Sequence, residues 1–300
     1  MKWRKITMYA IVTDTSANLD SALLERRGIC AIPFSFFDVK DEKEQTCLDT
    51  HGFDGEAYYE NMRRGTRYVT SQITPQRYID FLTPILRGGQ DVLFVGMSSG
   101  ISGAYHSAES AARTLLEEFP ERRIRLVDTL SASLGEGLIV LHAADRRDAG
   151  AELDALADEL TALRHRMCQI FSVDDLKYLH RSGRISGVAA LAGNILSIKP
   201  LLKGNEEGKI VCFGRVRGRK AAIKALADRY NELVVDAADQ TIGIAHAGCA
   251  QDAEALAELL RREKPPRDIL TVCYEPVTGS HVGPGTLALF FLSSDDVRSK

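Results

Sequence analysis

The segment that decides the fold is residues 91–119, which read DVLFVGMSSGISGAYHSAESAARTLLEEF. Its first part is apolar, its middle is rich in glycine and hydroxyl residues, and its last part has apolar residues at helical spacing. This order predicts a buried strand over 91–97 and a helix over 103–119, joined by a turn. A strand that leads into a helix is the repeating unit of an α/β fold.

Similar units flank this segment in the first half of the chain. Short apolar runs that are typical of strands alternate there with runs that have helical spacing. The expected strands are 9–14, 30–37 and 124–129, and the expected helices are 21–28 and 74–89. Such alternation predicts a mostly parallel sheet with helices on both faces. We therefore expect residues 1–150 to form an N-terminal α/β domain.

The second half of the chain has a different pattern. Two helical runs meet at Gly150, and the sequence GNEEG at 204–208 predicts the turn of a hairpin. The other expected strands are 168–175, 208–217, 241–248, 268–276 and 286–292, and the other expected helices are 183–197, 219–233 and 251–263. A hairpin combined with helices predicts that residues 151–300 form a C-terminal mixed α/β domain.

The composition argues against several classes of protein. Of the 300 residues, 45% are hydrophobic and 26% are charged, as in ordinary globular proteins. The net charge of −3 argues against a nucleic-acid-binding protein. No apolar run approaches the ~20 residues of a membrane-spanning helix, so we expect no stable membrane insertion.

The cysteines and the first residues bear on the cellular compartment. The six cysteines lie far apart and form no Cys-x-x-Cys pair, which argues against a disulfide framework and against a zinc site. The apolar run near the start ends at Asp14 without a small-residue cleavage site, so we expect a first strand and not a secretory signal. These features predict a cytoplasmic protein with reduced thiols.

The Gly-Met-Ser-Ser-Gly turn has two chemical interpretations, of which the first is catalytic. As the G-x-S-x-G pattern of a serine esterase, it would make Ser98 the nucleophile, with Asp174 or Asp175 and His246 or His281 as partners. However, a nucleophile elbow passes directly into its helix, whereas Gly100 and Gly103 follow this serine, so several loop residues precede the expected helix. Any chain of this length also offers such acidic and histidine partners, so their presence has little weight.

Anion binding is the second interpretation of the same turn. Ser98, Ser99 and Ser102 supply hydroxyl donors, and the glycines let backbone N–H groups approach a ligand beside a helix N-terminus. The turn also lies at the carboxyl end of a strand, where open α/β sheets bind ligands. A purely structural role, in which Ser102 caps the helix, is the remaining alternative.

Three other segments add candidate residues. YVTSQITP at 68–75 places Thr70 too early to cap the helix that follows. GSHVGPGT at 279–286 places His281 among glycines, in an expected loop between two strands. The basic segment GRVRGRKAAIKAL at 214–226 is either a solvated helix N-terminus or a docking site for phosphate or for a partner protein.

Together these segments resemble those of the DegV family of bacterial fatty-acid-binding proteins, which includes the binding subunits of fatty acid kinase. The matching segments include TSQITP, SSGISGAYHSA, VDDLKYLHRSGRIS, KIVCFGRVRGRKAAIKAL and GSHVGPGT. They run in order from about residue 10 to about residue 290, so the resemblance covers nearly the whole chain. It implies two α/β domains that enclose one long-chain fatty acid, such as palmitate, between them.

The resemblance also implies roles for individual residues. The residues that would bind the fatty-acid carboxylate are Thr70, one of Ser98, Ser99 and Ser102, and His281. Arg184 and Arg219 would correspond to basic residues at the pocket mouth or at a kinase-docking surface.

The family's activity, if shared, is that of a carrier and not of an enzyme. A separate ATP-dependent fatty acid kinase would phosphorylate the bound acid to an acyl phosphate. The carrier would then deliver this product to an acyltransferase of phospholipid synthesis. The resemblance implies no cofactor and no metal beside the fatty acid itself.

The physical chemistry of a buried fatty acid agrees with this function. A sixteen-carbon acid buries about fifteen methylene-type groups, which corresponds to ~12 kcal/mol gross at ~0.8 kcal/mol each. Its carboxylate needs hydrogen-bond donors, because an unpaired buried charge is costly. We expect these donors to be uncharged hydroxyls and an imidazole without a permanent cation, and we expect protonation of His281 to favour the acyl phosphate.

Overall fold

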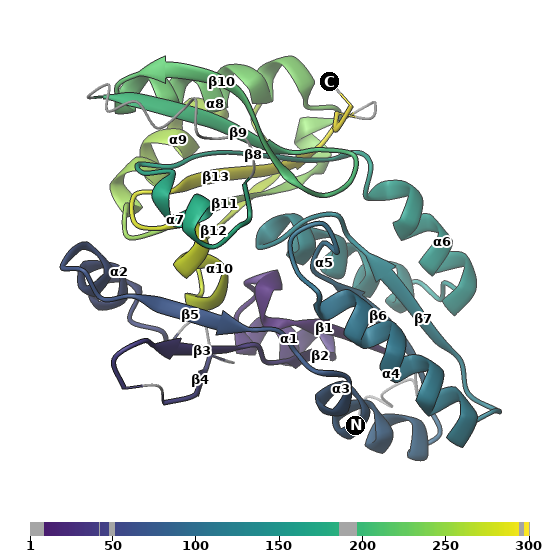
Figure 1. The fold of residues 1–300 in the computed structure, drawn as a ribbon. Coiled ribbons are helices and arrows are strands. Elements are labelled where there is room, and N and C mark those ends of the chain that lie inside the picture. The colour runs from purple at the N-terminus through teal and green to yellow at the C-terminus, as the bar shows by residue number, and fades with distance from the viewer. Residues whose placement is uncertain (1–8, 42, 48–51, 186–196, 294–296, 300) are drawn as a thin grey trace.

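The computed structural model describes residues 9–41, 43–47, 52–185, 197–293 and 297–299. Within these ranges the chain forms an α/β fold with three sheets, two of them large. Figure 1 shows a six-stranded sheet in the upper half and a four-stranded sheet in the lower half. The predicted fold class is therefore confirmed.

The four-stranded sheet is built by the first half of the chain. Its strands are parallel in the order β2-β1-β6-β7, where β1 is Tyr9–Asp14, β2 is Ile29–Ile32, β6 is Asp91–Gly96 and β7 is Ile124–Asp128. All six residues of β6 are buried, which explains why DVLFVG is a continuous apolar run with no polar alternation. The helices α3, Pro75–Arg87, and α4, Ala104–Glu118, pack against each other and against this sheet.

One predicted strand is in fact two. The expected strand over 30–37 is divided at Pro33, which lacks the N–H group that a sheet interior requires. Its first part is β2, and its second part is β3, Ser35–Asp38, which belongs to a separate antiparallel sheet of order β4-β3-β5. The other strands of this small sheet are β4, Gln45–Thr46, and β5, Tyr68–Ser71.

The six-stranded sheet is mixed, as predicted for the second half. Its order is β10-β9-β8-β13-β11-β12, and β11 and β12 are its parallel pair. The strands are β8, Met167–Ser172, β9, Ile198–Gly204, β10, Ile210–Arg217, β11, Thr241–His246, β12, Asp268–Cys273, and β13, Leu287–Leu292. The predicted hairpin turn joins β9 and β10 and is closed by a hydrogen bond of 2.9 Å from the Gly208 N–H to the Asn205 carbonyl. Most of the expected helix over 183–197 lies outside the described residues.

Helices cover the sheets and separate them. The remaining helices are α1, Ser21–Arg27, α2, Gly55–Arg63, α5, Leu134–Asp148, α6, Leu153–Leu163, α7, Lys177–Arg181, α8, Arg219–Leu233, α9, Ala250–Glu263, and α10, Pro276–Val282. α5 contacts strands of both large sheets and lies between them (Figure 1). Gly137 lets α5 pack closely on the 3-10 helix η1, Thr15–Ala17, because a Cβ atom there would lie 2.4 Å from the Ala17 carbonyl oxygen.

The packing of α6 bears on the expected domain boundary at residue 150. α6 follows this position in sequence but packs against β7 and α5. One cluster of buried apolar side chains also includes residues of both halves, from Ile11 in β1 to Phe290 in β13. The division into residues 1–150 and 151–300 therefore stays a prediction.

Helix α10 corrects two further expectations. The strand expected over 268–276 ends at Cys273, and the expected loop around His281 is helical as far as Val282. The helix forms because Pro276 occupies its first turn and the Glu275 carboxylate accepts hydrogen bonds of 2.6 Å from the Val277 and Thr278 N–H groups. α10 contacts β3, β5 and α7, so it carries His281 to the small sheet of the first half.

Candidate functional site

An apolar cavity of about 250 Å³ lies between residues of the two halves. Its apolar wall is formed by Phe34, Met97, Ile101, Ala132, Phe171, Leu179, Ile210, Tyr274, Val277, Val282 and Phe290. The polar members of the lining are Thr70, Gln72, Ser102, Ser133, Gln169, Thr278, Arg184 and His281. An apolar pocket with a few polar groups is the usual form of a small-molecule site. We call it the chain cavity.

Two predicted residues meet at the polar end of the chain cavity. Thr70 at the end of β5 and His281 in α10 are joined by a hydrogen bond of 2.8 Å between Oγ1 and Nε2. A threonine hydroxyl and a neutral imidazole have two protons between them, and their mutual hydrogen bond uses one. The pair therefore retains one donor, which is the Thr70 O–H if Nε2 carries the ring proton and the His281 Nδ1–H if Nδ1 does.

His281 is neutral at physiological pH. Burial and, to a smaller extent, the nearby Arg184 guanidinium lower the pKa of His281 to about 3. Without a ligand the imidazole is therefore uncharged, mainly because of burial and less because of the Arg184 charge. That a protonated His281 favours an acyl phosphate stays a prediction.

Arg184 lines the chain cavity itself. Its Nε donates to the Ile101 carbonyl at 3.3 Å, and its Nη1 donates to the Ser182 carbonyl. No carboxylate of the described residues forms an ion pair with it, and burial lowers the pKa of its guanidinium. The expectation that the site has only uncharged donors is thus wrong, because a permanent cation lies in its wall.

The three candidate serines have different positions. Ser102 lines the chain cavity, and its Oγ accepts a hydrogen bond of 3.2 Å from the Ala104 N–H. Ser98 is fully buried and donates to the Gly208 carbonyl at 2.9 Å. Ser99 donates to the Asp128 carboxylate at 2.6 Å. Ser98 and Ser99 are not in the cavity lining, and the hydroxyl proton of each is donated within the protein.

This position of Ser98 also bears on the serine esterase interpretation. A nucleophilic serine needs a base within hydrogen-bond distance and an exposed Oγ atom. The proton of Ser98 instead goes to a backbone carbonyl of the β9–β10 turn, and His281 is bonded to Thr70. The geometry therefore gives the esterase interpretation no support.

Arg219 has a bonding pattern unlike that of Arg184. Its Nε forms an ion pair of 2.9 Å with Asp252, and its Nη1 donates to the Gly285 carbonyl at 2.8 Å. Asp174 lies 3.7 Å from Nη1 and also pairs with Lys199 at 2.6 Å. Arg219 thus fixes the segment after α10 and is not part of the chain-cavity lining.

Several polar residues of the lining were not predicted from the sequence. Gln72 belongs to the same TSQ segment as Thr70. Its place beside a candidate ligand-binding residue was therefore a sequence signal for a residue of the lining. Gln169 is a polar residue in the otherwise apolar part of β8, and its side-chain oxygen accepts a hydrogen bond of 3.1 Å from the Ala132 N–H. A single amide within a buried strand is a signal, because buried polar groups need partners.

Two buried carboxyl groups lie near the chain cavity without lining it. Ser16 Oγ is 2.5 Å from an oxygen of Asp14 and 2.5 Å from an oxygen of Glu136. One hydroxyl proton cannot serve both contacts, so one acid must be protonated and donate to Ser16. Burial accordingly raises the pKa of both carboxyl groups. This cluster joins η1, Thr15–Ala17, to α5 and accounts for the Asp-Thr-Ser segment at 14–16.

Within the described ranges, no group of three or more His, Cys, Asp or Glu side chains is arranged to hold a metal ion. None of the helices in those ranges combines the length and the apolar character needed to cross a bilayer.

Comparison with known proteins identifies the family. A family model described as "Uncharacterised protein, DegV family" matches residues 8–294. The DegV domain-containing protein CPE0026 of Clostridium perfringens is 36% identical over 290 residues, which are 95% of this chain and 97% of that protein.

Solved structures agree with this match. The fold is similar to that of a fatty-acid-binding DegV family protein from Thermus thermophilus, with a TM-score of 0.85 and 30% identity over 96% of this chain and 100% of that chain. It is also similar to the fatty-acid-binding DegV family protein SAG1342 from Streptococcus agalactiae, with a TM-score of 0.82 and 28% identity over 96% and 99% of the two chains. The chain therefore belongs to the DegV family.

Proposed function

We propose that the protein binds one long-chain fatty acid, with the hydrocarbon chain in the chain cavity and the carboxylate at Thr70, Ser102, Arg184 and His281. The observation that carries this proposal is the Arg184 cation, which lies in the wall of an apolar cavity without a carboxylate partner among the described residues. A partly desolvated cation of this kind is unfavourable unless an anion completes the site. A fatty acid supplies both the anion and the apolar body.

The relatives support the same ligand class. The DegV proteins of Thermus thermophilus and Streptococcus agalactiae are both described as fatty-acid-binding, and each covers nearly the whole chain. The chain cavity provides the two parts that such a ligand needs. Its apolar wall gives affinity by removing methylene groups from water, and its polar end fixes the orientation.

We further propose that the bound acid is presented to a separate fatty acid kinase in the cytoplasm. In this reaction a carboxylate oxygen attacks the γ-phosphorus of ATP, ADP leaves, and an acyl phosphate remains for a downstream acyltransferase. The sequence itself contains no G-x-x-x-x-G-K-[ST] phosphate-binding loop, which supports a division of work between a carrier and a kinase.

Lipid analysis of the purified protein tests the first proposal. Native mass spectrometry is expected to find one fatty acid per chain, and solvent extraction is expected to release an acid of ~14–18 carbons. The delipidated protein is then titrated with hexadecanoate, where a buried sixteen-carbon chain predicts tight binding even after the costs of association. Absence of lipid in every preparation, together with no binding of hexadecanoate, would contradict the proposal.

Titration with a purified fatty acid kinase and ATP tests the second proposal. The loaded protein is expected to yield an acyl phosphate, which hydroxylamine converts to a hydroxamate that is measured by mass spectrometry. Binding of hexadecanoate without any product in this assay would leave the carrier function intact and would reject the kinase-coupled one.

A further inference from the structure

The chain cavity has a second polar group, which the proposed headgroup site does not use. Ser133 and Tyr274 both line the cavity, and their exposed fractions are 1% and 3%. Burial raises the pKa of the Tyr274 phenol, and hydrogen bonding with the Ser133 hydroxyl lowers it to a smaller extent. The two hydroxyls are therefore close together in the cavity wall, and we call them the hydroxyl pair.

The hydroxyl pair has hydrogen-bonding capacity that the protein does not use. Ser133 donates its proton to the Asn18 side-chain oxygen at 3.4 Å. Within the described ranges, the hydroxyl of Tyr274 has no polar partner other than Ser133. The pair can thus offer one proton, that of the phenol, and several lone pairs to a ligand. Because buried polar groups without partners are costly, a ligand that supplies a partner is favoured.

Ser133 is held beside Tyr274 by an uncommon backbone conformation. Its φ angle of 53° lies in the region that favours glycine. Ser133 is also the residue directly before α5, yet its hydroxyl makes no hydrogen bond that caps this helix. Backbone strain of this kind is typical of ligand sites, and here it directs the hydroxyl to Asn18 and Tyr274.

The hydroxyl pair lies at the start of α10, and the headgroup residue His281 lies in its last turn. Asn18 donates to the Cys273 carbonyl at 2.9 Å and accepts from the Glu275 N–H at 3.1 Å. It therefore fixes the backbone on both sides of Tyr274, just before the helix begins. The helix rises ~7.5 Å from its first residue to His281. An extended chain advances ~1.2 Å per bond, so about six bonds separate the two polar groups.

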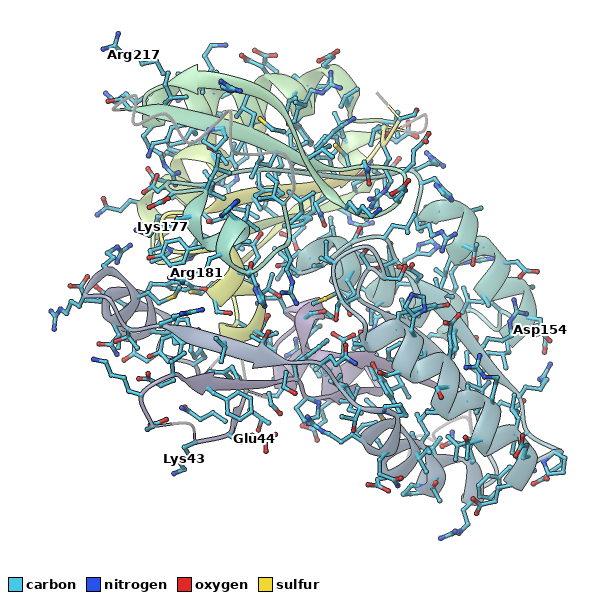
Figure 2. The ribbon with its side chains drawn as sticks, viewed as in Figure 1. Lys43, Glu44, Asp154, Lys177, Arg181 and Arg217 are labelled. Atoms are coloured by element: carbon cyan, nitrogen blue, oxygen red, sulfur yellow. The ribbon has the colours of Figure 1, made fainter. Side chains whose placement is uncertain are left out.

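The positive charge of the chain cavity lies at the His281 end. Arg184 lines that end, and its charge acts together with burial, the larger cause, to lower the pKa of His281. Arg181 lies beside the same end, where the two halves of the molecule meet (Figure 2). A fatty-acid carboxylate is therefore drawn to the His281 end, and the hydroxyl pair faces the hydrocarbon chain.

The chemistry of the hydroxyl pair favours an alcohol over a second acid group. The phenol of Tyr274 stays protonated, because burial, the Cys249 thiol and the Glu275 carboxyl group all raise its pKa. A further negative charge beside it would meet only one proton donor and would be unfavourable. An alcohol accepts one hydrogen bond and donates another, so it matches a phenol proton with lone pairs beside it.

We propose that the hydroxyl pair is a specificity site for a fatty acid that carries a hydroxyl group in the middle of its chain. The inference rests on the proposed fatty-acid function and names a subclass of ligand for it. The chain hydroxyl accepts a hydrogen bond from Tyr274 and donates one to the Ser133 oxygen, while the carboxylate stays at the His281 end. An unsubstituted acid leaves the pair without this partner and therefore binds less tightly.

Titration with matched ligands tests the site. Octadecanoate and its 3-hydroxy, 8-hydroxy and 10-hydroxy derivatives are titrated into the delipidated wild type and its variants. The wild type is expected to bind an 8-hydroxy or 10-hydroxy acid about tenfold more tightly than octadecanoate. Tyr274→Phe removes only the hydroxyl, so it is expected to abolish this preference and to change the octadecanoate affinity by less than about twofold. Tyr230→Phe, whose hydroxyl donates to the Lys264 carbonyl outside the cavity lining, is the control and is expected to keep the preference.

The outcomes separate this inference from the proposed function. Equal affinity of the wild type for octadecanoate and the mid-chain hydroxy acids, or a preference that survives in Tyr274→Phe, overturns the hydroxyl pair while octadecanoate binding still stands. A preference for the 3-hydroxy acid, or for octadecanedioate, overturns it as well, because the position or the charge of the group would then be wrong. Ser133→Ala is expected to reduce the preference in part, and thermal unfolding confirms that each variant is folded. Failure of the wild type to bind any of these acids would instead reject the proposed function.

Discussion

The hydrogen bond between Thr70 and His281 connects residues that are 211 positions apart in the sequence. It joins the end of β5 in the small sheet to the last turn of α10. Because the imidazole is neutral, the pair offers one hydrogen-bond donor and adds no charge. The single positive charge at the polar end of the chain cavity then comes from Arg184, so in the proposed complex the charge that attracts the acid and the donor that orients it belong to different residues.

Thr70→Val tests the role of the hydroxyl at this position. Valine has nearly the same shape as threonine but lacks the O–H group, so the apolar wall is kept. The hydroxyl that would donate to the carboxylate is lost, and so is the hydrogen bond that orients the His281 ring. We expect the affinity for hexadecanoate to fall about tenfold, as for loss of a hydrogen bond to a charged group. Titration of the delipidated protein measures the change. Thr114→Val on α4, an exposed position, is the matched control, and an unchanged affinity in Thr70→Val would contradict the assigned role.

Ser98→Ala distinguishes a structural serine from a nucleophile. Its hydroxyl donates to the Gly208 carbonyl and accepts a hydrogen bond of 3.1 Å from the Gly100 N–H, so it ties the turn after β6 to the β9–β10 hairpin. We expect a loss of ~1–2 kcal/mol in the free energy of unfolding, measured with denaturant, because a buried carbonyl loses its donor. Hexadecanoate affinity is expected to stay the same. Labelling of the wild type by a fluorophosphonate probe, with loss of labelling in the variant, would support the esterase instead.

Helix α10 shows how a short element determines the site. It has only seven residues, and it places Val277, Thr278, His281 and Val282 in the wall of the chain cavity. An isolated helix of this length is unstable in water, so its cap and its tertiary contacts must hold it. Glu275 provides the cap, and Asn18 of the first half accepts a hydrogen bond of 3.1 Å from the Glu275 N–H. The geometry of the site therefore depends on a carboxyl group outside the cavity lining.

Glu275→Gln tests the pH dependence that this cap implies. Burial raises the pKa of Glu275 to about 7, and the Asp14 carboxyl group contributes in the same direction. The folded protein therefore binds an extra proton between about pH 4.5 and pH 7, and its stability falls as the pH rises through this range. Glutamine resembles the protonated acid. As the pH rises from 4.5 to 8, we expect the free energy of unfolding to fall by ~3 kcal/mol less in the variant than in the wild type.

The comparison in this experiment removes the effect of other groups. The lowered pKa of His281 changes the stability in the opposite direction. Its contribution to the free energy of unfolding falls as the pH drops from about 6.5 toward 3. Both proteins contain His281, so its contribution cancels in the difference between the two unfolding curves. Glu258→Gln at an exposed position of α9 is the control. Parallel pH profiles for wild type and Glu275→Gln would show that the cap does not titrate in this range.

Regular elements were predictable from the sequence, and contacts between distant segments were not. β1 and α8 have the predicted limits, because local apolar periodicity defines both. Pro33 and the Glu275-Pro276 pair were local signals for the strand division and for α10. The pairing of β3 with β5 and the Asn18 contact join distant segments, which no local pattern contains. For the same reason Ser98, Ser99 and Ser102 were equivalent in sequence, whereas only Ser102 lines the chain cavity.

At the scale of the whole molecule, the chain cavity is closed only by both halves together. Met97 and Ile101 come from the turn before α4, whereas Phe171 and Phe290 come from neighbouring strands of the six-stranded sheet. The apolar core around them continues from one half into the other. A ligand that fills the cavity adds contacts to both halves at once, so it is expected to stabilise the entire fold and not one part of it.

Filling the cavity with a side chain tests this coupling. Ile101→Trp places an indole in the chain cavity from a partly exposed position in the turn before α4, where a larger side chain is tolerated better than in a strand. In the wild type, hexadecanoate at a hundredfold excess over its dissociation constant is expected to raise the free energy of unfolding by ~2.7 kcal/mol. Ile101→Trp is expected to lose this gain, while its stability without ligand stays close to that of the wild type. The control Ile101→Val is expected to keep the gain. Thermal unfolding with and without hexadecanoate measures both quantities, and an undiminished gain in Ile101→Trp would show that the acid binds elsewhere.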